Sequence, residues 1–320
     1  MHVAVTGAAG FIGSHTCERL IAQGHRVTGL DSFSDFLYPA EPKRDNARVL
    51  AALPRFRLIE GDLCDWETVA EAITKDVDVV CHLAALAGVR PSLAQPLRYV
   101  RTNVEGTGVL LERMRELGLR RLVFASSSSV YGANPGVAQA FREDAPCLNP
   151  ASPYAATKRM NELQLSTYRD LFGIGVFALR FFTVYGPRQR PDMAIAKFCG
   201  AISRGSTISL FGDGSSQRDY TYVDDVVTGT CAAIDRVTPG AYELYNLGGT
   251  QTISLRELVE TIERVVGRRA VIEWLPDQPG DVPITFANIE RARAALGFAP
   301  TTRPDEGIAR YWEWRVGRDR

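Results

Sequence analysis

The sequence predicts an α/β fold, in which a doubly wound parallel sheet is followed by a smaller C-terminal lobe. Short apolar runs alternate with amphipathic segments through the first half of the 320-residue chain. A glycine-rich turn joins the first apolar run to the first amphipathic segment. After about residue 182 the pattern becomes irregular, with Pro and Gly clusters at 186–191, 212–215 and 276–283. We therefore expect a sheet domain over residues 1–182, to which some later segments return, and a lobe formed mainly by residues 183–320.

The first strand is predicted at residues 2–6, and the first helix runs from Phe11 to Gln23. Three glycines mark the turn between them: Gly7, Gly10 and Gly13. Glycines here let the backbone approach a phosphate closely, and the helix N-terminus supplies donors and a favourable dipole. The second strand, 26–30, is followed by Asp31, whose carboxylate suits a ribose 2′-hydroxyl and repels a 2′-phosphate. The pattern predicts a Rossmann-type domain that prefers NAD to NADP.

Further strands are predicted at four later apolar runs: Phe56 to Glu60, Val77 to Leu83, Arg121 to Ala125 and Gly175 to Arg180. Ligands of such sheets bind beyond the carboxyl ends of the strands. Residues at these ends are therefore candidate cofactor contacts. Asp62 and Leu63 suit an adenine, and the small side chains of Ala84 and Ala85 would let a cofactor lie close to the backbone.

A helix is predicted after Ser152, a good N-cap, with Pro153 at its first position and Gly173 at its end. Tyr154 and Lys158 lie one turn apart on this helix. A free phenol, with a pKa of about 10, is a poor base at neutral pH. One positive charge at roughly 4 Å contributes on the order of 4 kcal/mol, or about three pKa units. Lys158 and an oxidised nicotinamide are therefore expected to bring Tyr154 into the working range of an acid–base group.

The composition is that of a metabolic enzyme. The 37 basic and 37 acidic residues cancel, which argues against a nucleic acid or an anionic membrane as partner. The chain begins directly in its first strand and has no long apolar stretch, so we expect no signal peptide and a cytoplasmic location. Six scattered cysteines form no CxxC pair, and four histidines show no metal-ligand spacing. We predict no metal and no histidine catalysis.

The order of motifs resembles the extended short-chain dehydrogenase/reductase family, and within it the nucleotide-sugar epimerases and dehydratases. The resemblance extends over essentially the whole chain. The motifs are, in order, Thr6-Gly7-x-x-Gly10-Phe11-Ile12-Gly13, Asp31, Gly61-Asp62, His82-Leu83-Ala84-Ala85, Asn103, Ser126 to Gly132, Tyr154-x-x-x-Lys158, Arg180 to Pro187, and Arg218-Asp219-Tyr220. The resemblance implies NAD as cofactor, with contacts from Gly7, Gly10, Phe11, Ile12, Gly13, Asp31, Ser32, Asp62, Leu63, Leu83, Ala84, Ala85, Asn103, Tyr154 and Lys158.

The same resemblance implies the reaction. The family's active-site Ser or Thr stands three residues before Val-Tyr-Gly, which implies Ser127 as the catalytic partner of Tyr154 and Lys158. The family's 4,6-dehydratases carry an Asp-Glu pair after this residue, and its UDP-glucuronate decarboxylases carry the Glu, whereas this chain has Ser128 and Ser129. Simple C4 epimerisation is therefore favoured. Hydride would pass from C4 to NAD, and the 4-keto sugar would rotate and receive hydride on its other face.

The substrate is indicated by a longer match, because residues 180–194 resemble the corresponding stretch of UDP-glucuronate 4-epimerases. Residues 31–35 with Lys43 and Arg44, 87–90 and 280–283 resemble them too. This resemblance implies conversion of UDP-glucuronate to UDP-galacturonate. It implies substrate contacts from Arg90, Ser127, Ser128, Thr183, Arg190, Lys197, Phe198, Phe211, Arg218 and Asp281, with Thr183 and Arg190 foremost for the sugar carboxylate and Arg218 for phosphate. Gln278 stands where many relatives have an arginine.

Other functions stay open at this point. A UDP-glucose 4-epimerase, or an epimerase of another neutral nucleotide sugar, would use Arg190 on the diphosphate instead. A UDP-glucuronate decarboxylase, a 4,6-dehydratase and a non-catalytic NAD-binding sensor are less favoured. In relatives, the helix from Asn103 to Leu117 and the helix that carries Tyr154 commonly pair across a dimer axis, so we expect a homodimer by resemblance.

Overall fold

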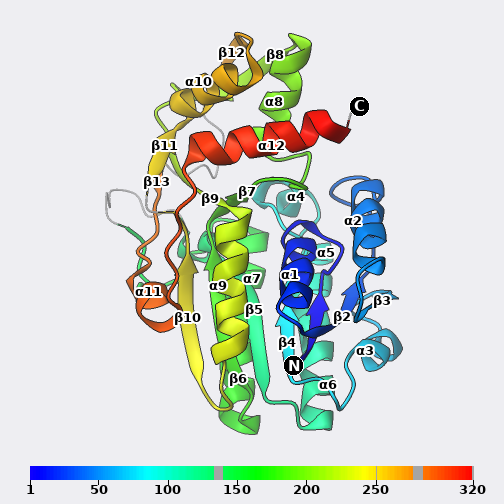
Figure 1. Ribbon diagram of the computed structural model, residues 1–320. Coiled ribbons are helices and arrows are strands. Elements are labelled where there is room, and N and C mark those ends of the chain that lie inside the picture. The colour runs from blue at the N-terminus through cyan, green and yellow to red at the C-terminus, as the bar shows by residue number, and fades with distance from the viewer. Residues whose placement is uncertain (133–139, 250, 277–283, 319–320) are drawn as a thin grey trace.

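The computed structural model describes residues 1–132, 140–249, 251–276 and 284–318. The chain forms two lobes, which lie one above the other in Figure 1. The lower lobe is a seven-stranded sheet between helices, and the upper lobe consists of helices with short strands. No helix in the described parts of the chain is long and apolar enough to cross a membrane.

All neighbouring strands of the large sheet run parallel, in the order β3-β2-β1-β4-β5-β6-β10. Their bounds are β1 His2–Thr6, β2 Arg26–Asp31, β3 Phe56–Glu60, β4 Val79–His82, β5 Arg121–Ser127, β6 Gly175–Phe181 and β10 Tyr242–Leu247. The strand order changes direction between β1 and β4, and open α/β sheets bind their ligands at the carboxyl edge of such a point. The predicted doubly wound α/β fold is confirmed.

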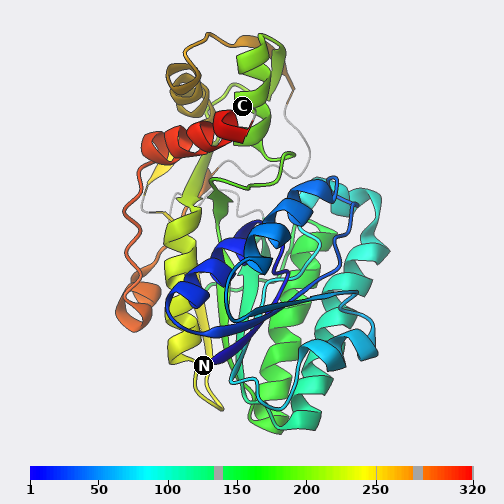
Figure 2. The ribbon, with the colours of Figure 1, turned by 45° about the vertical axis from the view of Figure 1, so that its right-hand side comes forward.

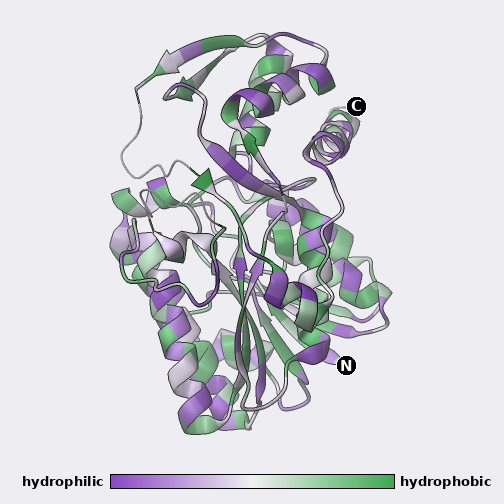
Figure 3. Cartoon of the chain, turned by 90° about the vertical axis from the view of Figure 1, so that its left-hand side faces the viewer, coloured by the Kyte–Doolittle hydropathy of each residue, from purple (hydrophilic) through white to green (hydrophobic). Residues whose placement is uncertain are grey.

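Helices cover both faces of this sheet (Figures 1 and 2). One face carries α1 (Phe11–Ala22), α2 (Glu41–Ala51) and α9 (Val223–Arg236); the other carries α3 (Trp66–Ala72), α6 (Gly106–Leu117) and α7 (Pro153–Phe172). Side chains alternate between the two faces of a strand. Val3 of β1 accordingly packs in one core with Leu20 of α1, whereas Ala4 packs in the other with Leu110 of α6. The helices show hydrophobic and hydrophilic residues side by side in Figure 3, as this two-layer burial requires.

The predicted ends of α7 agree with its caps. Ser152 Oγ accepts a hydrogen bond from the Ala155 N–H at 3.1 Å, and Gly173 adopts a left-handed φ of 67°. Short segments connect the strands to the helices on this side: α4 Val89–Ala94, α5 Pro96–Tyr99, the π-helical η1 Val100–Glu105, and the 3₁₀ turn η2 Ser128–Tyr131. These segments surround the N-terminal half of α7 and so border the carboxyl edge of the sheet.

The upper lobe is built on α8 (Ala194–Arg204), α10 (Leu255–Val266) and α12 (Pro304–Arg318). Two small sheets join it, one formed by β7 Thr183–Tyr185, β9 Gln217–Tyr222, β11 Thr252–Ser254 and β13 Ile284–Thr285, the other by β8 Thr207–Phe211 and β12 Val271–Leu275. Between these elements the chain returns twice to the lower lobe, as α9 and β10 and again as α11 (Glu290–Leu296). The two lobes are therefore interleaved along the sequence.

Candidate active site

A cavity of about 830 Å³ lies between the carboxyl edge of the large sheet and the upper lobe. Gly7 and Asp31 line it from the sheet, and Arg190 and Arg218 line it from the segments above. Nearly all of the predicted contact residues meet here. Those on its wall are Gly7, Gly10, Phe11, Ile12, Gly13, Asp31, Ser32, Asp62, Leu63, Leu83, Ala84, Ala85, Arg90, Ser127, Ser128, Tyr154, Lys158, Thr183, Arg190, Lys197 and Arg218.

The glycine turn between β1 and α1 has no room for side chains. A Cβ atom on Gly13 would lie 1.9 Å from the carbonyl oxygen of Gly7, and one on Gly7 would lie 2.8 Å from the backbone nitrogen of Ala84. Gly7 also has a positive φ of 71°, which disfavours other residues. The turn therefore brings backbone directly to the cavity wall at the N-terminus of α1, the geometry that suits a pyrophosphate.

Asp31 ends β2 beside this turn. Its Oδ2 accepts a hydrogen bond from the Ala9 N–H at 3.0 Å, and its Oδ1 accepts one from the Phe33 N–H at 2.9 Å. Burial raises the pKa of the Asp31 carboxyl, against these bonds and the charge of Lys43. The ammonium of Lys43 lies 4.0 Å from the ring centre of Tyr38, and both side chains line the cavity. Lys43 belongs to a stretch that resembles UDP-glucuronate 4-epimerases, but the resemblance implied no contact for it.

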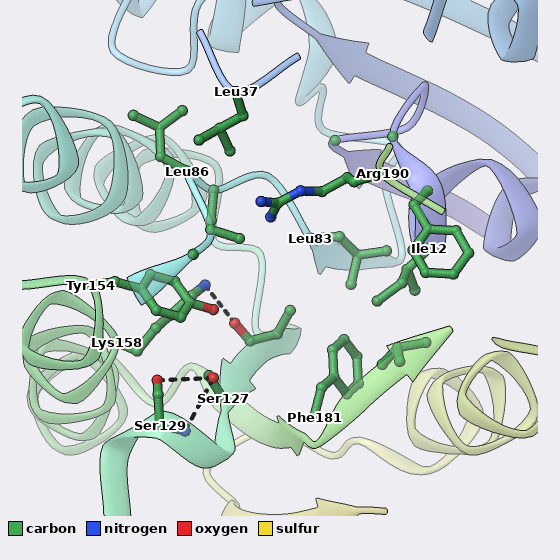
Figure 4. Close-up of a pocket in the computed structure, with 18 of the residues that line it drawn as sticks. Ile12, Leu37, Leu83, Leu86, Ser127, Ser129, Tyr154, Lys158, Phe181 and Arg190 are labelled. Carbon is green, nitrogen blue, oxygen red and sulfur yellow. Dashed lines mark hydrogen bonds between the residues drawn. The ribbon is translucent and has the colours of Figure 1, made fainter. Parts of the chain in front are cut away.

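Ser127 and the two residues of the YxxxK spacing converge on one side of the cavity (Figure 4). Tyr154 and Lys158 come from the first turns of α7, and Ser127 ends β5. The Lys158 ammonium donates a hydrogen bond of 2.7 Å to the carbonyl oxygen of Ala125. Burial lowers the pKa of Lys158 to about 7, although the Glu162 carboxylate acts in the opposite direction.

The sequence predicted that Lys158 and an oxidised nicotinamide together lower the pKa of Tyr154; in the protein alone, Lys158 does not lower it. Burial raises the pKa of its hydroxyl, while a hydrogen bond with Ser127 and the charge of Arg190 act to lower it. The reason is that burial disfavours the charged form of a phenol, whereas the ammonium of Lys158 is turned toward a backbone carbonyl. In the protein alone the environment therefore favours the neutral phenol.

The serine run after β5 begins with an N-cap. Ser127 Oγ accepts a hydrogen bond from the Ser129 N–H at 3.2 Å and one from the Ser129 hydroxyl at 2.9 Å. Ser128 and Ser129 both line the cavity. The resemblance implied Ser127 and Ser128 as contacts, but it gave no sign that the side chain of Ser129 hydrogen-bonds to Ser127.

A buried ion pair lies beneath this group. Glu162 of α7 accepts two hydrogen bonds of 2.9 Å from the Arg180 guanidinium and one of 2.7 Å from Ser126 Oγ. Burial alone would raise the pKa of Glu162, but these bonds, with a further one from Arg159, hold it below its usual range. The cluster ties α7 to the ends of β5 and β6 and so fixes where Ser127 and Lys158 lie.

Arg190 extends its guanidinium into the cavity (Figure 4). Its Nε and Nη2 donate hydrogen bonds of 2.9 and 2.6 Å to the two carboxylate oxygens of Asp192. A Cβ atom on Gly88, whose φ is 108°, would lie 3.3 Å from Arg190 Nη2. Glycine at this position therefore makes room for the guanidinium. Asp192 could not be predicted as the partner of Arg190, since nothing in a two-residue spacing within a loop predicts an ion pair.

Three predicted contact residues stand apart from the described cavity wall. Asn103 lies behind it and bonds to Leu86 N at 2.8 Å, Leu86 O at 3.0 Å and Thr157 Oγ1 at 3.0 Å, which holds the loop after β4 against α7. Phe198 packs against the larger core. Phe211 lies under the guanidinium of Arg90, 5.0 Å from its ring centre. Asp281 and Gln278 fall outside the described residues.

Neither metal ligands nor disulfides occur among the described residues. Their His, Cys, Asp and Glu side chains form no group that could hold a metal ion, and all six cysteines are free thiols. His82 is buried between Thr6 Oγ1 at 2.6 Å and Thr107 Oγ1 at 3.0 Å, and burial lowers its pKa to about 3. It thus links β1 to α6 as a neutral side chain.

Comparison with known proteins adds a family to this geometry. The NAD dependent epimerase/dehydratase family matches residues 3–248. The UDP-glucuronate 4-epimerase of Thermodesulfobacterium geofontis is 40% identical over 312 residues, 97% of this chain and 94% of that protein. A crystal structure of UDP-glucuronic acid 4-epimerase from Bacillus cereus, in complex with UDP-glucuronic acid and NAD, has a TM-score of 0.91 and 36% identity, covering 99% of both chains. The Thermus thermophilus UDP-glucose 4-epimerase in complex with NAD has a TM-score of 0.88 and 32% identity, again over 99% of both chains. The chain therefore belongs to the NAD dependent epimerase/dehydratase family.

Proposed function

We propose that this protein is an NAD-dependent UDP-sugar 4-epimerase that interconverts UDP-glucuronate and UDP-galacturonate. One observation carries the proposal: Ser127, Tyr154 and Lys158 converge on the same cavity into which Arg190 extends its guanidinium. A proton-transfer group and a cation thus face one space, as a sugar with both a C4 hydroxyl and a C6 carboxylate requires. The similarity to UDP-glucuronate 4-epimerases over nearly the whole chain supports the same substrate.

The cofactor part of the cavity fits NAD. Gly7, Gly10 and Gly13 expose the backbone for a pyrophosphate, and the Asp31 carboxylate ends β2 where a ribose 2′-hydroxyl would lie. Asp62 and Leu63 would contact the adenine, with Leu83, Ala84 and Ala85 along the rest of the cofactor. When bound, NAD supplies the hydride acceptor and donor at C4.

The protein's own groups handle the proton. Tyr154 takes the proton of the C4 hydroxyl as hydride leaves the carbon. It returns this proton after the 4-keto sugar has rotated in the cavity and received hydride on its other face. Ser127 hydrogen-bonds the reacting oxygen, and the ammonium of Lys158 favours the phenolate. Ser128 and Ser129 offer no carboxylate for loss of water across C5 and C6, which supports epimerisation over dehydration.

The 4-keto sugar of a uronate is a β-keto acid and is prone to lose carbon dioxide. Thr183 and Arg190 would hold its carboxylate near the ring plane, where the breaking bond overlaps poorly with the carbonyl π system. Lys197 and Arg218, also on the cavity wall, would meet the diphosphate, and Arg90 with Phe211 would border the nucleotide.

A neutral sugar is the second candidate, and one observation favours it. Asp192 already neutralises Arg190 through two hydrogen bonds, so the cavity has less positive charge than the guanidinium alone suggests. In a UDP-glucose 4-epimerase Arg190 would contact the diphosphate rather than a carboxylate.

Incubation of the purified protein with UDP-glucuronic acid, without added cofactor, tests the proposal. We expect UDP-galacturonic acid by chromatography and proton NMR, because the cofactor is regenerated in each turnover and NAD should co-purify. Arg190→Ala should raise the KM for UDP-glucuronate at least tenfold or release a UDP-pentose by-product, since a charge-assisted hydrogen bond contributes roughly 1.5–3 kcal/mol. Interconversion of UDP-glucose and UDP-galactose alone, even with added NAD, would establish the second candidate.

We propose in addition that the enzyme is a cytoplasmic homodimer. The free thiols of the described chain suit a reducing compartment. Exposed apolar side chains on α5, η1 and α7 support the dimer, among them Leu97, Val100, Met160 and Leu163. The segments that carry them lie against one another.

A further inference from the structure

Ser129 directs two hydrogen bonds at a single atom, the hydroxyl oxygen of Ser127 (Figure 4). The backbone N–H of Ser129 lies 3.2 Å from Ser127 Oγ, and its hydroxyl lies 2.9 Å away. A serine oxygen accepts two hydrogen bonds and donates one. Both acceptor positions of Ser127 are therefore filled from Ser129, and the proton of Ser127 has to point in a third direction.

The third direction leads to Tyr154. Ser127 and Tyr154 converge on one side of the cavity (Figure 4), and a side-chain hydrogen bond between them acts to lower the pKa of the Tyr154 hydroxyl against the effect of burial. Because Ser129 fills both acceptor positions of Ser127, only the proton of Ser127 is left for this bond. Ser129 therefore donates to Ser127, and Ser127 donates to Tyr154.

We propose that Ser129 is a positioning residue, which fixes the hydroxyl of Ser127 as a donor toward the side of the cavity where Tyr154 and the reacting oxygen of the substrate would meet. The inference rests on the proposed function for the reaction that this orientation serves, but it concerns contacts within the chain. Without the Ser129 hydroxyl, Ser127 would accept only the N–H bond of its N-cap. The proton of Ser127 would then no longer be held in one direction.

The other charged and titratable groups near Tyr154 come from three elements. Lys158 lies one turn along α7, and the ring of Tyr99 from α5 stands 6.2 Å from the Tyr154 ring. Arg190, paired with Asp192, faces Tyr154 from the segment after β7. A change at Ser129 removes none of them, so a change in the ionisation of Tyr154 would report the orientation of Ser127.

The test follows the ionisation of Tyr154 directly. NAD-loaded protein labelled with ¹³C at tyrosine Cζ is titrated by NMR, with the Tyr154 signal assigned from Tyr154→Phe. Ser129→Ala should raise the pKa of Tyr154 by roughly half to one unit, the effect of losing one oriented hydrogen bond. We also expect a loss of about 3- to 10-fold in kcat near pH 7, because a smaller share of the protein that holds one proton would carry the phenolate. Ser129→Thr, which keeps the hydroxyl, should restore the wild-type midpoint.

Ser128→Ala is the matched comparison, because it removes one hydroxyl from the same run and the same cavity wall. It should leave the Tyr154 midpoint in place, even where it changes KM. An unchanged midpoint in Ser129→Ala, or an equal shift in Ser128→Ala, would overturn the proposal. If Ser129→Ala folds poorly, Ser129→Cys keeps the volume with a weak donor and should give the same shift. The titration needs no turnover. Inactivity of the wild type toward UDP-sugars would therefore contradict the proposed function, while the titration would still decide whether Ser129 orients Ser127.

Discussion

Burial moves the ionisation of Tyr154 and Lys158 in opposite directions. It raises the pKa of the phenol and lowers the pKa of the ammonium to about 7. The pair therefore loses its first proton near pH 7 and keeps the second to high pH. Within the form that holds one proton, the reactive arrangement is a phenolate next to an ammonium, which has the same net charge as a neutral phenol next to an amine. We therefore expect Lys158 to set the pH at which Tyr154, in the proposed reaction, can act as a base.

This argument predicts the pH dependence of the reaction. In the wild type, kcat/KM should rise with pH to a plateau with a midpoint at or below about pH 7, because the shared proton is lost there. Lys158→Met should move that midpoint to the raised pKa of Tyr154, so activity at pH 7 should fall at least 100-fold and then rise about tenfold per pH unit up to pH 9. Steady-state kinetics from pH 5.5 to 9 measure both. A pH-independent deficit in Lys158→Met would contradict the prediction, and Tyr154→Phe should stay inactive throughout.

At the scale of residues, the sequence predicted which residues meet at the cavity better than it predicted the contacts they make there. A glycine turn, an acidic strand end and a one-turn spacing are local patterns, so Gly7, Asp31 and Tyr154 could be recognised from them. The roles of Ser129 and Asp192 come from hydrogen bonds whose direction depends on the folded backbone. Such contacts leave no periodic signal in the chain.

The helix α7 carries a third polar side chain at the spacing of Tyr154 and Lys158. Glu162, one turn further on, is fully buried and paired with Arg180, which is 1% exposed. Together with Ser126 it fastens α7 to the ends of β5 and β6. A buried ion pair adds little net stability over an apolar pair, but removal of one partner leaves an uncompensated charge.

Glu162→Gln should therefore lower the free energy of unfolding by about 3–5 kcal/mol, because the guanidinium of Arg180 stays buried without a carboxylate. Urea unfolding followed by circular dichroism measures this loss. A Glu162→Gln, Arg180→Met double variant should be destabilised by less than the sum of its single variants. Glu71→Gln is the matched control, since its ion pair with Arg57 is exposed and should contribute less than about 1 kcal/mol. Equal losses in the two Glu→Gln variants would rule out the special role of Glu162.

At the scale of elements, the first half of the fold followed from the sequence and the second half did so only in part. Central strands such as β5 are buried on both faces and read as apolar runs. The edge strand β10 begins with Tyr242-Glu243 and is only half buried there, so it resembles the irregular segments around it. The π-helical η1 before α6 is placed by the bonds of Asn103 to the loop after β4, and not by helical periodicity.

In the whole molecule, the cavity is separate from the exposed apolar side chains that support the proposed dimer. The cavity lies between the carboxyl edge of the large sheet and the upper lobe, whereas these apolar side chains are exposed on α5, η1 and α7. Leu97 is 81% exposed and Leu163 is 55% exposed, and both belong to helices that pack on one another. Met160 and Leu163 are three residues apart on α7, so they share a face. A two-fold axis at this face would bury the same patch of both copies against each other.

The proposed dimer predicts that a single charge at its interface changes the mass of the protein in solution. Wild-type protein should have twice the 35.2 kDa mass of the chain in size-exclusion chromatography with light scattering. Leu163→Asp should give the monomer at micromolar concentration, since an unpaired carboxylate at the centre of an apolar interface costs several kcal/mol, a change of at least 100-fold in Kd. Val271→Asp on β12 is the control, because Val271 is equally exposed, at 54%, on the upper lobe. It should leave the mass unchanged. A monomeric wild type would contradict the dimer, and loss of the dimer in Val271→Asp alone would place the interface elsewhere. In either case the apolar face of α7 would need another partner.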